Sequence, residues 1–289
     1  YAVDSSGSNW MELTQDLEDK AVIDMAIYQG RMHVLTESAL YNHEGENWLP
    51  IELPMAEGQK ETENLDLLTE KVGLPAEVLE LHLEQALIRL GLQESGRNTI
   101  IPLSLFVEGE DLYVGTIGDG LYMRVANQWK NVGMEEKSIV DIAFDDRSKE
   151  LFAVACDSTS TCGVFHSKGG EWVSIQSTLL DINVTKILET ENGLLAAANS
   201  GIYWLDPENQ QWLLIGGQGK NILSITTADN CDWAAAGQGF GLVSSDCGEN
   251  WQEFSLENWR YQTIAFLGEQ RELLFVGSQE AGAIIIPIY

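Results

Sequence analysis

Four residue types stand at fixed positions in the eight residues SSDCGENW, which run from Ser244 to Trp251. A carboxylate in a polar loop, such as that of Asp246, is typical of catalytic and metal-binding loops. The same pattern fits a turn, because an Asp side chain accepts hydrogen bonds from the backbone of its own turn and Gly248 permits a positive φ. Only a structural turn is expected to recur along the chain.

Carboxylates elsewhere in the chain could form the pair that glycosidases place on either side of the scissile bond. The candidates near expected loops and strand starts are Glu37, Asp119, Asp157, Glu280, Asp24 and Asp141. The chain has 45 acidic residues, so several carboxylates on one face are expected by chance. It shows no Gly-rich phosphate loop, Ser-His-Asp order or calcium loop, and its His residues are scattered. We therefore expect no catalytic residue, no cofactor and no metal.

The charge of the chain restricts its partners. Acidic residues outnumber basic ones by 45 to 16, and the net charge is −29. Binding to nucleic acid is not expected, because phosphate contacts need clustered Lys and Arg. No apolar run approaches the roughly 20 residues of a membrane-spanning helix, so membrane insertion is not expected either. A chain that opens with Tyr-Ala-Val is typical of a mature or trimmed product.

A unit of about 40 residues recurs along the chain and would position these loops. Each copy has an alternating strand such as VIDMAIY, a second strand, a short loop, a third strand and a polar turn that ends in Trp. Period-two alternation marks half-buried strands, and a fourth short strand follows each Trp. The turn tryptophans are Trp10, Trp48, Trp129, Trp172, Trp212 and Trp251. They predict six antiparallel meanders, each the size of a β-propeller blade.

The two ends of the chain are expected to complete one blade. The last unit, TIAFLGEQRELLFVGSQEAGAIIIPIY, has three strands and no Trp turn. The N-terminal YAVDSSGSNWMELT has a Trp turn and a following strand, with nothing before them. An N-terminal strand beside the C-terminal strands would leave no open sheet edge. The prediction is an all-β, six-bladed β-propeller closed in this way, with residues 1–289 as a single domain.

The recurring turn resembles that of the Asp-box, or BNR-repeat, β-propellers. SSDCGENW matches the form Ser-x-Asp-x-Gly-x-x-Trp through Ser244, Asp246, Gly248 and Trp251, and degenerate versions occur as NHEGENW, HSKGGEW and SSGSNW. The resemblance implies that the box is a structural turn on the side away from the usual ligand face. It also implies that Trp251 packs between neighbouring blades.

Sialidases share this propeller, and membership among them would imply an arginine cluster, a tyrosine–glutamate nucleophile and an acid. The seven Arg of this chain do not supply three that converge on one face, so sialidase activity is not expected. The chain also resembles the photosystem II assembly-factor-like propellers, which have degenerate boxes and lack the sialidase residues. The arginine-rich patch on their binding face is absent here. The resemblance therefore implies only their class, a non-enzymatic propeller that binds protein.

The strand pattern stops over residues 55–98. Leucines recur there at helical spacing from Leu79 to Leu90, which predicts a helical hairpin. This insertion joins the fourth strand of one blade to the first strand of the next. Such connections lie on the same face as the loops between second and third strands. The hairpin either braces a blade or docks a partner, and the sequence leaves both open.

The four cysteines fall into two local pairs in this topology. Cys156 and Cys162 flank the loop DSTST between adjacent strands, and Cys231 and Cys247 lie in two turns at the same end of one blade. This placement predicts the disulfides Cys156–Cys162 and Cys231–Cys247, with four unpaired thiols as the alternative. Disulfides favour an oxidising space, so the predicted location is periplasmic or secreted.

The loops between second and third strands are short and polar, and they suit a peptide tail, a protein loop or a small glycan. The candidate binding residues on them are Glu37, Asp119, Asp157, Asn199, Gln238, Phe240 and Glu280. Phe240 is either an anchor for a ligand or a packed residue. We predict a non-enzymatic, extracytoplasmic propeller that binds a protein partner in an assembly, stability or scaffold role, with 55–98 as a further contact. The alternative is a glycan-binding or glycoside-hydrolysing propeller that uses the loop carboxylates.

Overall fold

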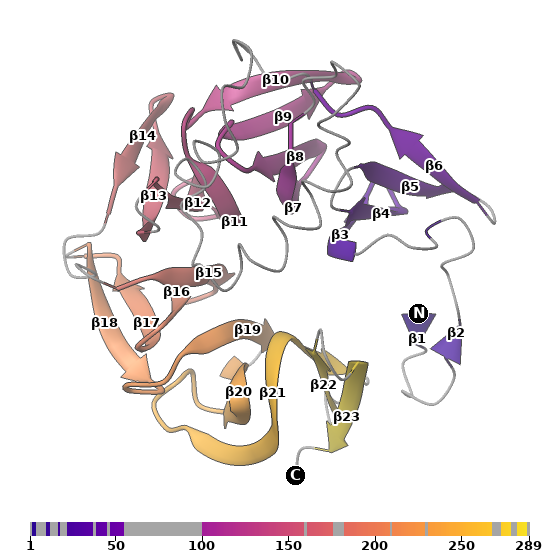
Figure 1. Ribbon diagram of the computed structural model, residues 1–289. Helices are drawn as coiled ribbons and strands as arrows, with labels where there is room; N and C mark the ends of the chain where they lie inside the picture. Colours follow the sequence, from indigo (N-terminus) through magenta and orange to yellow (C-terminus); the bar gives the residue numbers. More distant parts are fainter. Residues whose placement is uncertain are drawn as a thin grey trace. The chain divides into compact units, whose positions relative to one another are not determined.

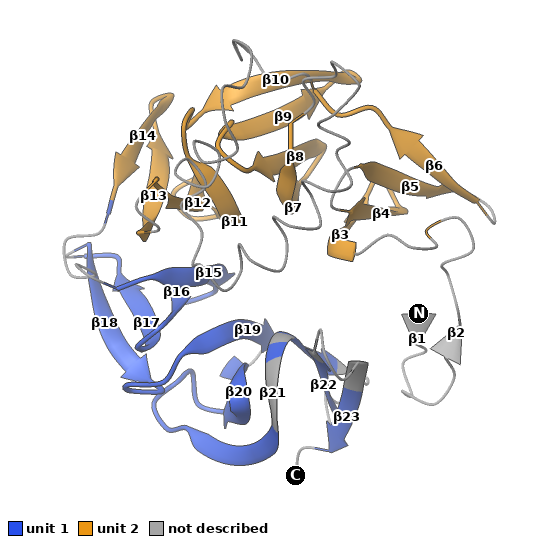
Figure 2. Ribbon diagram, viewed as in Figure 1, with its two compact units in different colours: residues 1–14, 175–289 blue, residues 15–174 orange. Residues whose placement is uncertain are grey.

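The structure is a computed structural model, drawn in Figure 1. It describes residues 2–3, 10–11, 17, 22–36, 39–44, 47–54, 100–158, 161–175, 182–208, 210–228, 231–267, 273–278 and 282–287. Every element assigned to these ranges is a β-strand. The chain divides into two compact units, one of residues 1–14 and 175–289 and one of residues 15–174 (Figure 2). The helical hairpin expected over 55–98 lies outside the described residues.

The unit of residues 15–174 contains three antiparallel four-stranded meanders. The first is β3 (Val22–Tyr28), β4 (Arg31–Thr36), β5 (Leu40–Glu44) and β6 (Asn47–Ile51). The second is β7 (Pro102–Glu108), β8 (Asp111–Thr116), β9 (Leu121–Val125) and β10 (Gln128–Gly133). The third is β11 (Ser138–Asp145), β12 (Glu150–Cys156), β13 (Cys162–Lys168) and β14 (Glu171–Ser174). Strands that follow one another in sequence are neighbours in each sheet, as the repeat predicted.

The other unit continues the same repeat. Its first meander is β15 (Val184–Thr190), β16 (Gly193–Ala198), β17 (Gly201–Asp206) and β18 (Gln211–Gly216). It is followed by β19 (Ile222–Ala228), β20 (Asp232–Ser244), β21 (Gln252–Leu267), β22 (Leu273–Ser278) and β23 (Gly282–Pro287). The chain bends within β20 at Gly239, whose φ is 79°. Strand β21 pairs with β20 as far as Arg260 and with β22 from Tyr261 onward. These two long elements therefore each supply two successive strands of the repeat.

The meanders confirm the predicted all-β, six-bladed β-propeller arrangement. The N-terminus differs in one detail, because β1 (Ala2–Val3) precedes the first turn tryptophan and pairs with β2 (Trp10–Met11). A two-residue strand is too short to show alternation, so the sequence did not reveal β1. In the part of the chain that the structure describes, neither strand pairs with β22 or β23. Closure of the last blade by an N-terminal strand stays a prediction.

The first strand of every blade has a β-bulge at the same register. The residues skipped in the pairing with the second strand are Ile23, Leu103, Val140, Thr185, Leu223 and Gln262. Side chains at or next to these bulges reach the neighbouring blade. Ser104 Oγ donates to the Ile139 carbonyl at 2.8 Å, and Thr185 Oγ1 donates to the Ile222 carbonyl at 2.8 Å. The bulges therefore help to join adjacent blades within each unit.

Tryptophans at the turns between third and fourth strands join the same blades further out. Each donates its indole N–H to a carbonyl of the preceding blade: Trp129 to Glu52 at 2.8 Å, Trp172 to Val132 at 2.9 Å, Trp212 to Ile175 at 2.9 Å and Trp251 to Ile215 at 3.0 Å. Val132 and Ile215 are the extra residues of bulges in β10 and β18. An extra residue is left out of the strand ladder, so its carbonyl is free to accept from the next blade.

Candidate binding loops and the turns at the opposite end of each blade

In a four-stranded meander the loop between the second and third strands and the connection to the next blade lie at one end. The turns between first and second strands and between third and fourth strands lie at the other end. The predicted binding residues belong to the first group and the predicted Asp-box residues to the second. Asp119 and Asp157 lie in the unit of residues 15–174, and Asn199, Gln238 and Phe240 lie in the other. Glu37 and Glu280 lie outside the described residues.

The loop that carries Asp119 is fixed by its own hydrogen bonds. The Thr116 N–H and the Thr116 hydroxyl both donate to the Gly120 carbonyl, at 3.1 and 2.7 Å. The Gly120 N–H in turn donates to the Lys137 carbonyl in the connection to the next blade, at 3.2 Å. Gly118 and Gly120 have φ of 77° and 78°, which favours glycine at both positions. Asp119 is half-buried at the tip of this loop.

The loop that carries Asp157 is closed covalently. The predicted disulfide between Cys156 and Cys162 is present, and the two cysteines are direct partners across β12 and β13 with Cα atoms 3.9 Å apart. The Asp157 N–H donates to the Thr161 carbonyl at 3.2 Å, and Asp157 Oδ1 accepts from the Thr161 N–H at 3.3 Å. One carboxylate oxygen of Asp157 therefore helps to shape its own loop.

Asn199 likewise helps to shape its own loop, which lies between β16 and β17. Its N–H donates to the Asn183 carbonyl at 3.0 Å, and its Oδ1 accepts from the Asn183 N–H at 3.2 Å. The neighbouring Ser200 carbonyl accepts from the Gly219 N–H in the connection to the next blade, at 2.8 Å. Asn199 remains exposed while its loop is held at both sides.

The side chain of Phe240 packs against its own blade and is only partly exposed to solvent. Its ring is half-buried against the core of its blade and lies so close to Gly237 that a Cβ there would overlap it. The Lys220 ammonium lies 4.6 Å from the ring centroid and also pairs with Glu253 at 2.9 Å. Sequence reasoning missed Lys220, although a lysine in a connection on the loop end was a visible signal. Gln238, at the bend in β20, is exposed.

The loops of each unit are polar and have fixed backbones. Within the described ranges, no group of three or more His, Cys, Asp or Glu is placed to hold a metal ion. The loops offer carboxylate and amide side chains on backbones that their own hydrogen bonds fix. Pre-shaped polar loops of this kind bind ligands without a large ordering cost.

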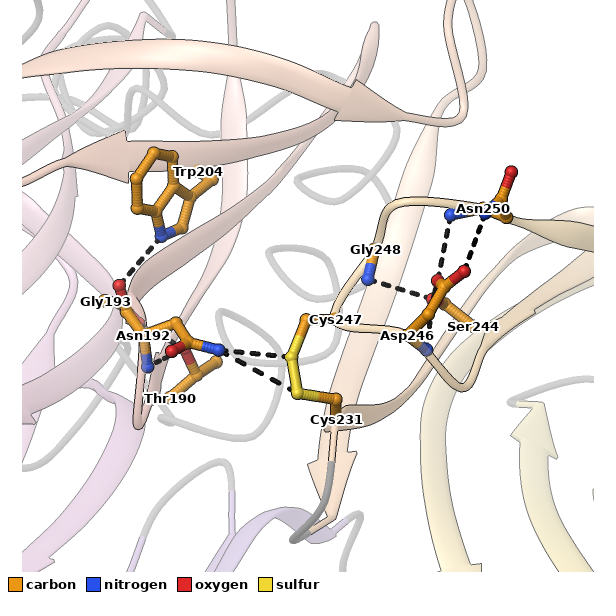
Figure 3. Close-up of a disulfide and its surroundings, with 10 residues drawn as sticks. All are labelled: Thr190, Asn192, Gly193, Trp204, Cys231, Ser244, Asp246, Cys247, Gly248 and Asn250. Atoms are coloured by element: carbon orange, nitrogen blue, oxygen red, sulfur yellow. Dashed lines mark hydrogen bonds between the residues drawn. A yellow bond between two sulfur atoms is a disulfide. The ribbon is translucent and has the colours of Figure 1, made fainter.

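At the opposite end of the fifth blade, which runs from β19 to the first part of β21, the turn over 244–251 is held by its own side chains (Figure 3). Ser244 Oγ donates to Asp246 Oδ1 at 2.8 Å and accepts from the Gly248 N–H at 2.9 Å. Asp246 also accepts from the Asn250 side chain at 2.7 Å and from the Asn250 N–H at 2.9 Å. These hydrogen bonds, with those from Asn250 the strongest, hold the pKa of Asp246 below its ordinary value.

The second predicted disulfide, Cys231–Cys247, links the 244–251 turn to the turn between β19 and β20. Its Cα atoms are 4.2 Å apart, and the Cys247 N–H donates to the Cys231 carbonyl at 3.2 Å. The side-chain amide of Asn192, on the neighbouring blade, lies against the sulfurs (Figure 3). This contact was not predicted from the sequence. Both disulfides were predictable because each pair lies in short loops of one meander.

Solved structures show the same fold over nearly the whole chain. The extracellular domains of the hybrid two-component systems BT4673 and BT3049 from B. thetaiotaomicron match 94% and 97% of it, with TM-scores of 0.65 and 0.64 and 12% identity each. The chain spans only 32% and 35% of those two structures. A structure of YCF48 bound to D1 peptide matches 98% of this chain over 83% of its own length, with a TM-score of 0.62 and 16% identity.

At these identities the structural likeness shows the fold alone. No model of a protein family matches the chain, and a search of curated proteins finds no relative. Among the described residues, no helix is long and apolar enough to cross a membrane.

Proposed function

We propose that this protein is a non-enzymatic propeller that binds a segment of a partner protein through the loops between its second and third strands. The observation that carries the proposal is the fixed shape of these loops. Their backbones are held by the Thr116–Gly120 and Asn183–Asn199 hydrogen bonds and by the Cys156–Cys162 disulfide, while Asn199 and Gln238 stay exposed. Loops with fixed backbones lose little conformational entropy on binding. They therefore favour recognition of an extended segment, because only that segment has to become ordered.

Two comparisons support this proposal. The YCF48 structure, which matches nearly the whole chain, contains a bound peptide. The two B. thetaiotaomicron matches are extracellular domains, and the two disulfides of this chain suit an oxidising compartment. We therefore propose a location in the periplasm or outside the cell, and an assembly, stability or scaffold role.

The net negative charge of the chain favours a positively charged partner segment. The chain carries 45 acidic and 16 basic residues, so a segment with Lys or Arg is complementary to it and would be steered toward it at low salt. Binding is then expected to weaken as the salt concentration rises. The insertion over 55–98 is a proposed second contact, because it enters on the same end of its blade as these loops.

The test is capture from the native envelope fraction with the intact protein and with single variants in the loops and at a control position. Asp119→Lys and Gln238→Lys change the proposed loops, and Glu249→Lys changes the exposed opposite turn by the same charge as Asp119→Lys. We expect one protein to be captured by the intact chain and by Glu249→Lys, and at least about tenfold less by each loop variant. Melting temperatures within a few degrees of the intact protein confirm that every variant is folded.

Equal capture by all variants, or no captured protein, would contradict the proposal. A variant with 55–98 replaced by a Gly/Ser linker shows whether the insertion contributes. If the loop variants instead lose binding to an immobilised glycan panel, the glycan alternative replaces the protein partner.

A further inference from the structure

The two disulfides differ in their access to solvent. Cys156 and Cys162 are 1% and 3% exposed between β12 and β13. Cys231 and Cys247 are each half-exposed in turns at the other end of the fifth blade. Thiol–disulfide exchange requires a thiolate to reach a sulfur along the S–S axis, so its rate depends on access. Exchange in the folded protein should therefore favour Cys231–Cys247.

The backbone at this disulfide is held in an uncommon conformation. Cys231 and Cys247 have φ of 68° and 57°, both in the left-handed region that favours glycine. A non-glycine residue in that region is strained by its Cβ and persists only where its surroundings hold it. The covalent link between the two turns supplies part of that constraint. Opening the bond would let both cysteines relax.

The neighbouring fourth blade places a hydrogen-bond donor within reach of both sulfurs and closer to Cys247. Asn192 Nδ2 lies 3.1 Å from Cys247 Sγ and 3.9 Å from Cys231 Sγ (Figure 3). Asn192 is itself positioned, because its N–H donates to Thr190 Oγ1 at 3.2 Å and its carbonyl accepts from Trp204 Nε1 at 3.1 Å. A donor at this distance stabilises the negative charge of a thiolate. The asymmetry makes Cys247 the better leaving group.

We propose that Cys231–Cys247 is a thiol–disulfide exchange site whose substrate is a dithiol reductant. The reductant thiolate attacks Cys231 Sγ, forming a mixed disulfide, and Cys247 Sγ leaves as a thiolate that accepts from Asn192 Nδ2. The second thiol of the reductant then attacks the other reductant sulfur, which is bonded to Cys231 Sγ in the mixed disulfide, and releases Cys231. Two electrons pass from the dithiol to the protein disulfide, and the two thiol protons end on Cys231 and Cys247.

Reduction would act on the contact between the fourth and fifth blades. Cys247 lies in the turn that precedes Trp251, whose N–H bonds the Ile215 carbonyl of the fourth blade. Asn192 also belongs to the fourth blade and touches the disulfide directly. Loss of the covalent link leaves the Ser244 and Asp246 hydrogen bonds and the Trp251 contact to hold this turn. The site therefore couples the redox state of the fifth blade to its packing on the fourth.

The first experiment measures reduction site by site in the folded protein. The native protein is treated with dithiothreitol, quenched with iodoacetamide at timed points, and mapped by peptide mass spectrometry. We expect Cys231 and Cys247 to be alkylated at least about tenfold faster than Cys156 and Cys162. Equal rates, or faster reduction of Cys156–Cys162, would overturn the proposal.

A second experiment tests the roles of the two sulfurs. Brief treatment with the monothiol 2-mercaptoethanol, followed by alkylation, should trap the reagent mainly on Cys231 and the alkyl group on Cys247. The variant Asn192→Leu should slow reduction by dithiothreitol several-fold, whereas Asn192→Gln, which keeps an amide donor, should recover part of the rate. An adduct mainly on Cys247, or an unchanged rate in Asn192→Leu, would overturn the assigned mechanism. Unchanged tryptophan fluorescence of both variants shows that the blade contact is intact.

Discussion

Asp246 and Ser244 both make hydrogen bonds that hold the 244–251 turn, but of the two only Ser244 is buried. Ser244 is 6% exposed and satisfies the Gly248 N–H, which lies inside the turn. We expect Ser244→Ala to lower the free energy of unfolding by about 1–3 kcal/mol, because it leaves a buried donor without a partner. Chemical denaturation followed by tryptophan fluorescence measures this. The control is Ser245→Ala at the exposed neighbouring position, where a loss as large would contradict the argument.

His33 makes the stability of the unit of residues 15–174 depend on pH. Burial lowers its pKa below 6.5, despite the hydrogen bond between its ring and the Arg31 carbonyl. The folded protein keeps His33 neutral where the unfolded chain takes up a proton. Its contribution to stability is therefore complete above about pH 6.5 and is lost progressively as the pH falls below that value, toward the lowered folded pKa.

The variant His33→Phe keeps a ring against Tyr28, whose centroid lies 5.4 Å from that of His33, and removes the titrating group. Between about pH 6.5 and 5.5, the intact protein should lose up to about 1.4 kcal/mol of stability more than this variant. Urea unfolding at three pH values across this range measures the difference. Parallel pH profiles for the two proteins would show that His33 is not the responsible group.

At the scale of the element, the fourth strands β10 and β18 are shaped to receive the next tryptophan. Each has a bulge, and the glycine that follows the bulge residue, Gly133 or Gly216, lies directly under an indole ring. A Cβ on Gly216 would overlap Trp251. We expect Gly216→Ala to cost about 1–3 kcal/mol through overpacking. Thermal unfolding against Gly277→Ala, a strand glycine whose Cβ would make only ordinary contacts, measures the effect. Similar losses in both variants would contradict this account.

The sequence predicted the elements far better than their contacts. Alternation in VIDMAIY and the recurring tryptophans located β3 and the blade repeat, because each pattern reflects local geometry. The bulges in β10 and β18 were missed, since Val132 and Ile215 are aliphatic residues like any others in a strand. A glycine after each was the one signal that could have suggested them. Asn192 was missed for a related reason: its partner lies on the next blade, and periodicity says nothing about packing between blades.

At the scale of the whole molecule, the six-bladed repeat was predictable because its pattern recurs six times in the sequence, whereas the candidate binding residues do not recur. The loops vary from blade to blade in length and composition. Several of their polar side chains, such as those of Asp157 and Asn199, serve their own loops. A polar residue that shapes a loop and one that binds a ligand look alike in a sequence. The partner must therefore be found by binding experiments on the folded protein.

The charge of the whole chain makes a further prediction. With a net charge of −29, the folded molecule is destabilised by repulsion among carboxylates that the longer unfolded chain holds further apart. Three of the described ion pairs, Arg31–Glu44, Lys149–Asp146 and Lys220–Glu253, are exposed or nearly so, and such pairs contribute little. Raising the salt concentration from about 10 to 150 mM shortens the screening length from about 30 to 8 Å, so repulsion weakens more than attraction.

We therefore expect the melting temperature at neutral pH to rise by several degrees over this range of sodium chloride. Circular dichroism at a strand wavelength, in a low-salt buffer with increasing salt, measures it. Choline chloride at the same ionic strength should give the same rise, because screening does not depend on the identity of the cation. A rise with sodium alone would indicate ion binding instead. A melting temperature that falls with both salts would mean that attractive pairs outweigh the repulsion.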